Sequence, residues 1–457
     1  MSSALGLPSC PSAFGRDKLS AEIASCPPLP DFTAHYSALP EVCRPIRIAC
    51  PCIGVDGCGH ALQVMSVKAN MVNCFDLQSG YLDALMEHMQ DMGQEVINLH
   101  FGKVEGDLTR VALSSLERPV DFLVAGPPCP PWAGQGTRKG CKDPKAKVFM
   151  AVIQWVEFLI ACGGLLGCIL ENVVGLTHET ADGREPTSDK FLRALRAHCP
   201  TFAWRLDVLS LVDYLLPQTR VRVFIRGMSK SVAEIVPRPL APFGRTPLRQ
   251  VLANLPSTPR SHLSARHQTN LLDFEIAIKD AFRGGKLVSG DVVVCSVDRS
   301  SSQDVVWEAG FSVNNVPTLT TRNQFLFILS VDCVIHNVDD ASREFFRFLS
   351  GPERFLLQGF PPKLARLLPK EKLVFASGNS YPVPLIVATL HPMLEALIAS
   401  GLDLLTHPSL SVLAQSERPP ANALMKALMA PGKIVNKDKY DVHKMQRKKR
   451  RCDNSSS

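Results

Sequence analysis

Short apolar runs alternate with longer amphipathic segments through the first half of the chain. Ile46–Cys50, Val72–Phe75 and Asp121–Ala125 are runs of the kind that form buried strands. Gly80–Met92 and Val148–Ala161 instead carry apolar residues at helical spacing. Further strands are predicted at Leu165–Leu170, Arg205–Leu211 and Arg220–Arg226. Strands that alternate with helices in this way favour a doubly wound α/β domain.

The same pattern divides the chain into five parts. Residues 1–43 are rich in Ser, Pro and Ala and predict a flexible N-terminal arm. Residues 44–228 carry the alternating pattern, so they form the first part of the main domain, which closes at 375–405. Residues 229–374 begin with a proline-rich stretch that lacks sustained periodicity, and they predict a second, smaller domain. Residues 406–457 predict a disordered basic tail.

Composition adds mainly exclusions. With 46% hydrophobic and 20% charged residues, the chain is globular rather than disordered as a whole. The nine basic and two acidic residues of Lys433–Arg451 account for the whole net charge of +7, so the rest of the chain is neutral overall. No apolar run reaches the ~18 residues of a membrane helix, and the N-terminus has no signal-peptide pattern, so no membrane association is expected.

The cysteines predict neither a disulfide framework nor a metal site. The chain has 15 cysteines but no Cys-x-x-Cys pair, and it is too long for a disulfide scaffold. Cys50, Cys52 and Cys58 lie close in sequence but lack the second pair that zinc sites favour. Reduced thiols and no bound metal are therefore expected.

The most informative segment is Pro127-Pro128-Cys129-Pro130-Pro131-Trp132, which directly follows a predicted strand. The prolines restrict the backbone around Cys129, and the carboxyl ends of strands are where α/β folds bind ligands. These features favour a cysteine nucleophile, although a buried structural cysteine is the alternative. A mobile basic loop is predicted to follow, with Gly134, Gly136, Arg138, Lys139 and Gly140.

Three other segments carry chemistry. Glu171-Asn172-Val173 ends a predicted strand, where a carboxylate can act as an acid or a hydrogen-bond partner, or simply form a salt bridge. Alternation places Gln218, Arg220 and Arg222 on one face of a strand, which indicates either an anion site or a solvated edge. Gly378-Asn379-Ser380 forms a turn before an apolar helix.

Together these segments resemble the DNA (cytosine-5) methyltransferases, over about residues 44–399. The family's Pro-Cys, Glu-Asn-Val, Gln-x-Arg-x-Arg and Gly-Asn-Ser motifs are intact and in order, at Pro128-Cys129, Glu171–Val173, Gln218–Arg222 and Gly378–Ser380. The resemblance implies an α/β protein with a Rossmann-like class I methyltransferase fold and a smaller target-recognition domain. It also implies that S-adenosylmethionine is the cofactor and duplex DNA the partner.

The resemblance also implies roles for the motif residues. In the family, a cysteine thiolate adds to carbon 6 of a flipped-out cytosine, and carbon 5 then takes the methyl group. Cys129 corresponds to this nucleophile, and Glu171 to the residue that holds or protonates nitrogen 3. Arg220 is expected to grip the base and orient Cys129. Nothing indicates a protein partner.

The cofactor residues correspond less closely. Gly57 and Gly59 match the glycine turn of the first family motif, but its leading Asp and Phe are absent. Asp76 corresponds to the ribose carboxylate and Asp107 to the residue that contacts the adenine amino group. Pro128 and Asn379 complete the set of expected cofactor contacts. Pro130 stands where the family usually has Gln.

DNA contacts are expected from two places. Arg222 and Gln218 belong to the arginine motif. The stretch Ile235–Leu272 has no acidic residue, and it falls in the region that the family uses for target recognition. Its arginines suit contacts with phosphates, and Arg238, Arg245 and Arg249 are predicted to make them.

Two alternatives remain open at this level. Enzymes of one subgroup use the same chemistry on transfer RNA, but the Cys-Phe-Thr segment of that subgroup is absent here. A non-catalytic DNA-binding paralogue would explain the altered first motif and Pro130, but the presence of Cys129, Glu171 and Arg220 argues against it. The run Arg447–Arg451 is typical of a nuclear localisation signal or of a nonspecific nucleic-acid-binding arm, with a plain solvated tail as the alternative, and localisation to the nucleus is expected.

Overall fold

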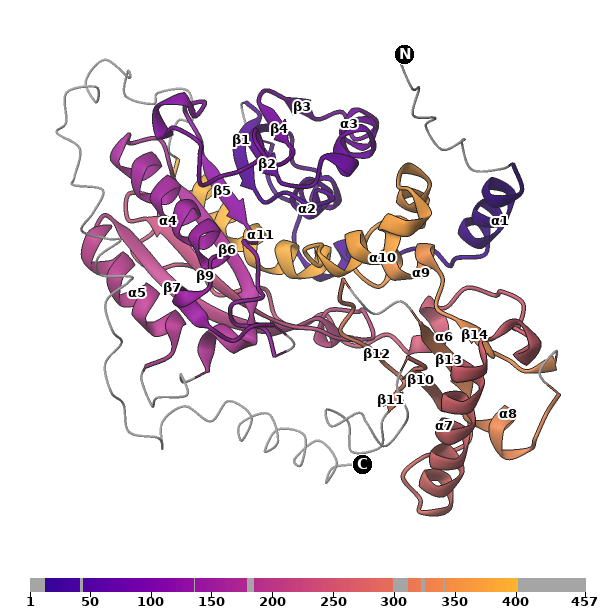
Figure 1. Ribbon diagram of the computed structural model, residues 1–457. Coiled ribbons are helices and arrows are strands. Elements are labelled where there is room, and N and C mark those ends of the chain that lie inside the picture. The colour runs from indigo at the N-terminus through magenta and orange to yellow at the C-terminus, as the bar shows by residue number, and fades with distance from the viewer. Residues whose placement is uncertain are drawn as a thin grey trace, which may run out of the picture. The chain divides into compact units, whose positions relative to one another are not determined.

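The computed structural model describes residues 13–401, apart from 42–43, 135, 179–184, 299–310, 322–324 and 340–341 (Figure 1). The chain forms two compact units. Among the described residues, the large unit comprises Phe32–Ser210, Val221–Pro242 and the chain from Val383 to residue 401. The small unit comprises residues 13–31, together with Leu211–Arg220 and Phe243–Pro382. The predicted arginine motif is therefore divided, because Arg220 ends a segment of the small unit and Val221 begins one of the large unit.

The large unit is built on an eight-stranded sheet with the order β3-β2-β1-β5-β6-β9-β7, in which β4 also pairs with β2. All neighbours are parallel except β9, which is antiparallel to both β6 and β7. This is a Rossmann-like methyltransferase sheet, so the predicted fold class is confirmed. The strands are β1 Ile46–Pro51, β2 Ala69–Asp76, β3 Glu95–Val96, β4 Leu99–Phe101, β5 Phe122–Ala125, β6 Gly167–Val173, β7 Phe202–Ser210 and β9 Val221–Ser229.

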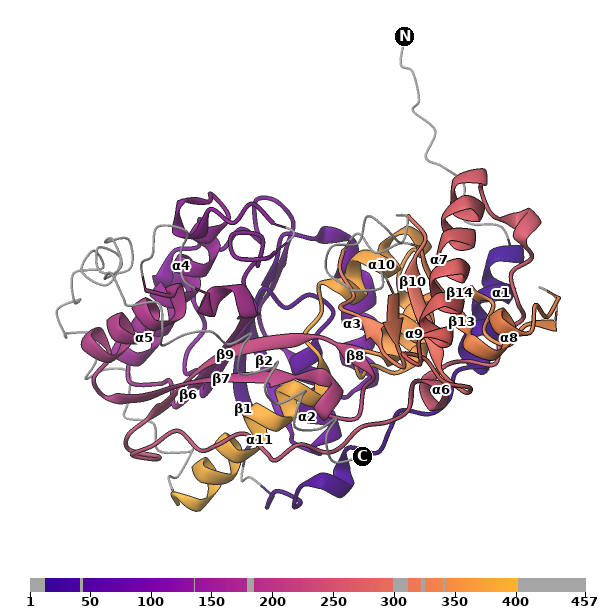
Figure 2. The ribbon, with the colours of Figure 1, turned by 90° about the horizontal axis from the view of Figure 1, so that it is seen from below.

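Helices cover both faces of this sheet (Figures 1 and 2). Cys168 and Leu170 of β6 point into a core that they share with α4 and α5. Gly167 lies on the opposite face, where a side chain would collide with Phe122 and approach Met393 of α11. The alternation of one strand thus separates the two helical layers. The helices are α2 Gly57–Val64, α3 Leu82–Asp91, α4 Ala146–Ala161, α5 Thr187–His198 and α11 Val383–Ala399.

The small unit has its own antiparallel sheet, with the order β11-β10-β13-β14. Helix α7 packs on it through Leu271, Phe274 and Ile278. A separate parallel pair joins β8 to β12. The strands are β8 Gln218–Thr219, β10 Val292–Ser296, β11 Phe311–Val313, β12 Val316–Pro317, β13 Leu326–Ser330 and β14 Arg347–Phe348. The helices are α1 Ala13–Ala24, α6 Leu248–Val251, α7 Ala265–Arg283, α8 Val331–Ile335, α9 Gly351–Leu356 and α10 Lys370–Gly378.

The structure corrects two expectations about organisation. The predicted flexible arm contains helix α1, which packs within the small unit. Its run of Lys, Leu, Ala and Glu explains this, since these residues favour helices. The predicted boundary at residue 228 also shifts, because the large unit continues to Pro242. The predicted basic tail lies outside the described residues.

A buried ion pair joins the last strands of the large sheet to the closing helix. Arg226 of β9 is fully buried, and its Nε and Nη2 donate to Oδ2 of Asp207 on β7 at 2.9 and 2.7 Å. Its Nη1 donates to the carbonyl of Thr389 in α11 at 3.1 Å, and Nη2 also donates to the carbonyl of Pro237 at 2.7 Å. One guanidinium therefore connects four segments that are distant in sequence.

Asp207→Ala is expected to destabilise the protein by about 3–5 kcal/mol, because it leaves the buried guanidinium of Arg226 without its anion. Arg205 is the matched control, since its Nε bonds the other oxygen of Asp207 at 2.7 Å but its side chain is 35% exposed. Arg205→Ala should cost at most about 1 kcal/mol. Urea denaturation of both variants measures the difference, and equal losses would show that Arg226 does not depend on Asp207.

The described residues contain neither a clear membrane-spanning helix nor a cluster of metal ligands. No single helix there is long and apolar enough to cross a membrane, although the bent pair α10 and α11 passes on length and composition alone. No group of three or more His, Cys, Asp or Glu side chains in that part of the chain is arranged to hold a metal ion.

Candidate active site

The pairing of β5 with β6 brings the two strongest sequence motifs together. The strands are parallel, and Ala125 lies opposite Leu170 at their carboxyl ends. The Pro-Cys segment therefore leaves β5 beside the last residues of β6, which are Glu171 and Asn172. Asn172 is 1% exposed, and its Nδ2 donates to the carbonyl of Pro127 at 3.2 Å. Both motifs thus lie at one edge of one sheet, within the large unit.

The nucleophile candidate Cys129 is half-buried and begins a folded turn. Its carbonyl accepts hydrogen bonds from the backbone amides of Trp132 and Ala133, both at 2.9 Å. Trp132 is 7% exposed and packs edge-on against Phe149 and Phe191 of the core. The side chain of Trp132 therefore anchors the turn after Cys129 in the core.

The loop that was predicted to be mobile and basic is folded in this structure. The amide of Gly136 donates to Ala133, and the amide of Gly140 donates to Pro131, both at 2.9 Å. A side chain at Gly136 would lie 2.1 Å from the carbonyl oxygen of Pro130. Arg138 and Lys139 are exposed, as expected for a basic loop.

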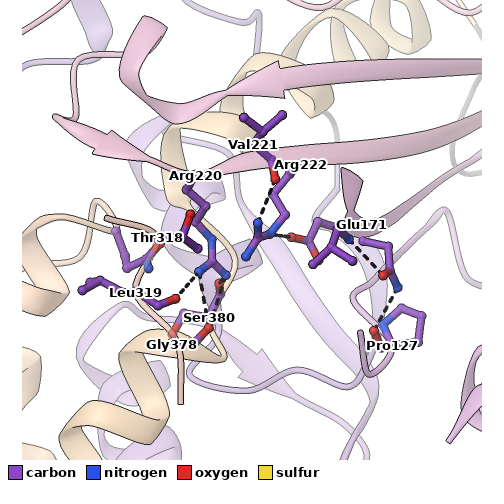
Figure 3. A network of polar contacts seen from close by, with 12 residues as sticks. Pro127, Glu171, Arg220, Val221, Arg222, Thr318, Leu319, Gly378 and Ser380 are labelled. Carbon is purple, nitrogen blue, oxygen red and sulfur yellow. Dashed lines mark hydrogen bonds and ion pairs between the residues drawn. The ribbon is translucent and has the colours of Figure 1, made fainter. Parts of the chain in front are cut away.

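Glu171 forms an ion pair with Arg222, the last residue of the arginine motif. Its Oε1 lies 2.8 Å from Nε of Arg222, and both side chains are only 10% exposed (Figure 3). The antiparallel register explains this contact, because Glu171 pairs with Phe224 and Arg222 is two residues away on the same face. Each charge is therefore compensated where water is largely excluded.

Arg220 is committed to the small unit. Its Nη1 donates to the carbonyl of Leu319 at 2.9 Å, and its Nη2 donates to the carbonyl of Ser380 at 2.8 Å (Figure 3). Both groups also approach the carbonyl of Gly378 at 3.4 Å. The guanidinium therefore joins the strand of the arginine motif to the Gly-Asn-Ser segment, and this contact set differs from the expected grip on a base. Arg222, not Arg220, is the arginine beside Glu171.

Gln218 was expected to contact DNA, and the structure corrects this. Its side chain is fully buried, with Nε2 donating to the carbonyl of Leu357 at 2.9 Å. Its Oε1 accepts from the amides of Leu319 and Gln358 at 3.2 and 3.4 Å. Both ends of the side chain amide are thus used inside the small unit.

The remaining predicted residues are found at separate places. Asn379 is exposed and caps the carboxyl end of α10 in the small unit. Arg238 is exposed in the large unit, and Arg245 forms an exposed ion pair with Asp213 in the small unit. Arg249 bonds Glu344 and the carbonyl of Gly290, so its guanidinium is partly used within that unit.

The turn between β1 and α2 forms a second edge of the site. Gly54 has φ +60°, a left-handed conformation that favours glycine, and its amide donates to Oδ2 of Asp76 at 3.0 Å. Asp76 ends β2, is 9% exposed and also accepts from the amide of Gln78. Burial raises the pKa of Asp76, and these two amides oppose that effect. Sequence reasoning identified Asp76 but missed Gly54, because a left-handed turn leaves no mark in hydrophobic spacing.

A second loop packs against Asp76. The amide of Gly102 donates to the backbone carbonyl of Asp76 at 3.0 Å, and a side chain at Gly106 would lie 2.0 Å from that oxygen. Asp107 follows, and its Oδ1 accepts from the amide and hydroxyl of Thr109. The Thr109 hydroxyl is the largest cause that lowers the pKa of Asp107. The two predicted acids therefore belong to one connected group of loops.

Asp56 is the unexpected residue of the first turn. It has φ +58°, is fully buried, and its Oδ1 accepts from the amide of Gly59 at 2.8 Å at the start of α2. Its Oδ2 is buried without a hydrogen-bond donor. Burial raises the pKa of Asp56 to about 7. A side chain at Gly59 would collide with this carboxyl, which explains the glycine there.

The family-level comparison agrees with the motifs. The model of the C-5 cytosine-specific DNA methylases matches residues 89–395, which is well over half of the chain. The chain belongs to this family. It is therefore an S-adenosylmethionine-dependent DNA cytosine-5 methyltransferase, and the predicted family, enzyme class and cofactor are confirmed.

Individual relatives and solved structures are similar to this chain at low sequence identity. The type II methyltransferase M.HaeII of Haemophilus aegyptius is 24% identical over 66% of this chain and 83% of its own. M.NgoBI of Neisseria gonorrhoeae is 25% identical over 65% of this chain and 81% of its own. The structure of a Spodoptera frugiperda DNMT2 mutant is 15% identical, with a TM-score of 0.47, and matches 77% of this chain and all of that one.

The residues present in this methyltransferase fit S-adenosylmethionine. Asp76 offers a carboxylate at the end of β2, where a ribose diol needs an acceptor. Beside this carboxylate lie the left-handed turn at Gly54 and the start of α2, where Gly54 and Gly57 have no side chain to keep a ligand from the backbone. Gly57 begins α2, and Gly106 packs directly on the backbone of Asp76, where a side chain would lie 2.0 Å from its carbonyl oxygen.

The carboxyl of Asp56 predicts an unusual dependence of stability on pH. Its pKa is about 7 in the folded protein and 3.8 ordinarily, so the folded state holds a proton that the unfolded chain has released. Folding stability should therefore fall as pH rises from about 4 to about 7, by at most about 4 kcal/mol. Asp56→Asn keeps the oxygen that caps α2, tolerates positive φ and removes the titration.

Denaturation of both proteins across this range measures the effect. The difference between Asp56→Asn and the unaltered protein should be small at pH 4 and should grow in favour of the variant up to pH 8. A difference that stays constant with pH would mean that Asp56 is ionised at ordinary pH in the folded protein.

Proposed function

We propose that this methyltransferase acts on duplex DNA through a covalent adduct between Cys129 and a flipped-out cytosine. The observation that carries the proposal is the shared edge of β5 and β6. There Asn172 of β6 donates a hydrogen bond to Pro127, two residues before Cys129. The preceding residue of β6 is Glu171, which forms the buried ion pair with Arg222. A nucleophile and a hydrogen-bonding carboxylate at one sheet edge are what addition to a cytosine ring requires.

The reaction begins at carbon 6 of the base. The Cys129 thiolate forms a bond from Sγ to carbon 6, and the electron pair of the 5,6 double bond moves to carbon 5. S-adenosylmethionine supplies the methyl group that carbon 5 takes. Loss of the carbon 5 proton to a base, and expulsion of the thiolate from carbon 6, restore the aromatic ring. The thiolate is regenerated, so the enzyme turns over.

Glu171 and Arg222 act on the opposite side of the ring. Glu171 acts here in its protonated form, which takes up a proton from solvent as the base binds: it donates a hydrogen bond to nitrogen 3, supplies the proton as negative charge develops, and recovers it when the ring is restored. Arg222, which already contacts Glu171, donates to the carbonyl oxygen of the base. This assigns to Arg222 the base contact that was first expected of Arg220. The base must leave the duplex to reach these groups.

The cofactor is held by the loops that meet at Asp76. The carboxylate of Asp76 accepts from the ribose hydroxyls, and Asp107 accepts from the adenine amino group. The turn of Gly54 and Gly57 lets the cofactor approach the backbone without side chains in the way, while the amide of Gly54 orients the carboxylate of Asp76. Pro128 borders the same edge, next to the nucleophile.

DNA binding and cellular location follow from charge. The exposed Arg238 is proposed to contact phosphates, with Arg245 and Arg249 contributing less because Asp213 and Glu344 pair with them. The run Arg447–Arg451 is proposed as a nuclear localisation signal, and no membrane association is proposed.

Replacing the nucleophile tests the chemistry directly. Cys129→Ser should abolish methyl transfer to duplex DNA, because a hydroxyl is too weak a nucleophile, while the melting temperature stays within a few degrees. The measurement is incorporation of labelled methyl groups from S-adenosylmethionine into duplex DNA, with transfer RNA as a parallel substrate. Full activity of the variant would refute the covalent mechanism, and labelling of RNA alone would refute the substrate.

The two arginines of one motif form a matched pair of variants. Arg222→Gln should lower kcat at least 100-fold, because a charged donor to the developing anion is lost. Arg220→Gln should instead destabilise the fold by roughly 1–3 kcal/mol, because buried carbonyls lose their donor. Steady-state kinetics and thermal melting of both variants measure these effects. The reverse pattern would restore Arg220 as the residue that grips the base.

A further inference from the structure

The loop that carries Cys129 lacks most of its backbone donors. Four of the five residues from Pro127 to Pro131 are prolines, which have no N–H. The four prolines can contribute only carbonyl oxygens and packing, which leaves the N–H of Cys129 as the one backbone donor of the segment.

The carbonyls of this loop are used accordingly. Those of Cys129, Pro130 and Pro131 accept from backbone amides further along the same loop, at 2.9–3.0 Å. The carbonyl of Pro127 accepts instead from the side chain of Asn172, on a neighbouring strand. The bonds within the loop fix its shape, whereas the bond from Asn172 fixes its place on the sheet.

Asn172 is oriented for this contact. Its Oδ1 accepts from the backbone amide of Val173 at 2.9 Å, which turns Nδ2 toward Pro127. Its side chain is 1% exposed, so water offers little competition. Alternation along β6 sends it to the face opposite Glu171. One strand therefore presents the carboxylate on one side and supports the nucleophile loop on the other.

A second contact follows directly along the chain. After β6 the backbone reaches Gly175, where a side chain would lie 2.0 Å from the carbonyl oxygen of Trp132. The loop is thus contacted on both sides of Cys129, at Pro127 by β6 and at Trp132 by the segment after β6. Asn172 supplies the polar contact and Gly175 the close packing.

We propose that Asn172 is a positioning residue for the nucleophile, which sets the place of Cys129 through the carbonyl of Pro127. The inference rests on the proposed function for the role of Cys129, but the contact that it invokes is independent of that chemistry. Nucleophilic addition needs the reacting atoms at about 3–3.5 Å, and a misplacement of about 1 Å costs on the order of 100-fold in rate. The loss should therefore fall on kcat and spare cofactor binding.

The test uses two variants of Asn172 in the full chain. Asn172→Ala removes the donor, and kcat for duplex DNA should fall at least tenfold, with an unchanged dissociation constant for S-adenosylmethionine by calorimetry. Asn172→Asp replaces the donor with a carboxyl that can donate only when protonated. Its activity relative to the unaltered enzyme should therefore rise as pH falls from 8.5 to 6, whereas the ratio for Asn172→Ala should stay flat.

A buried asparagine elsewhere provides the control for stability. Asn270 is 8% exposed, and its Nδ2 donates to the carbonyl of Val297 at 2.8 Å in the small unit. Asn270→Ala removes the same kind of bond and should lower the melting temperature similarly. At saturating DNA it should leave kcat within about twofold. Equal effects of the two alanine variants on kcat would mean that Asn172 acts only through stability.

A readout without catalysis separates this inference from the proposed function. Alkylation of Cys129 by iodoacetamide, followed by mass spectrometry of its peptide, should be several-fold faster in Asn172→Ala than in the unaltered protein, because the loop has lost its anchor. Unchanged alkylation, or an unchanged kcat in an active protein, overturns the positioning role. If the unaltered protein fails to methylate DNA but Asn172→Ala still speeds the alkylation of Cys129, the proposed function is refuted and the positioning role of Asn172 stands.

Discussion

The parallel pairing of β5 with β6 is the constraint on which the active site depends. Because Ala125 and Leu170 lie opposite each other, the residues that follow both strands emerge together at one edge. A slip of one residue would reverse the faces of Glu171 and Asn172, and would break both the ion pair with Arg222 and the bond to Pro127. The apolar faces of β6 resist such a slip, since each packs on a different helical layer.

The arginine motif shows how one short strand can serve two purposes. Arg220 and Arg222 are separated by a single residue, yet the first bonds backbone carbonyls of the small unit and the second pairs with a carboxylate of the large unit. Gln218 resembles Arg220, with its amide used entirely by the small unit. The spacing indicated three side chains around one anion, but Gln218 and Arg220 bond groups of the small unit and only Arg222 pairs with a carboxylate.

Sequence reasoning recovered what depends on apolar spacing and on intact motifs. Six strands of the large sheet and helices α3 and α4 were predicted within a few residues, because their apolar residues recur at regular spacing, whereas the short strands β3 and β4 were not predicted. Helix α7 was missed, although Leu271, Phe274 and Ile278 have helical spacing, since they follow a proline-rich stretch. The roles assigned to Cys129 and Glu171 stay predictions.

What could not be predicted depends on backbone conformation and on distant partners. The left-handed turns at Gly54 and Asp56 determine the shape of the cofactor edge, and neither has a signature in hydropathy. Asn172 belonged to a recognised motif, but its partner Pro127 is 45 residues earlier, so only the register of two strands reveals the contact. The prediction that Gln218 contacts DNA failed for a similar reason. Its side chain is buried and bonds Leu357, a partner that is far away in the sequence.

The large unit is built from segments that are separated in the sequence, and this affects how long the intervening segment can be. Along the chain, helix α11 of the large unit follows Phe243–Pro382, which belongs to the small unit. For the large unit that stretch is a loop that must be closed, and doubling the length of a loop adds only about 0.6 kcal/mol to the entropy of closure. The catalytic sheet therefore tolerates an inserted segment of almost any size between β9 and α11. A segment of different length and shape can be accommodated there without changing β5 and β6, the strands that position Cys129.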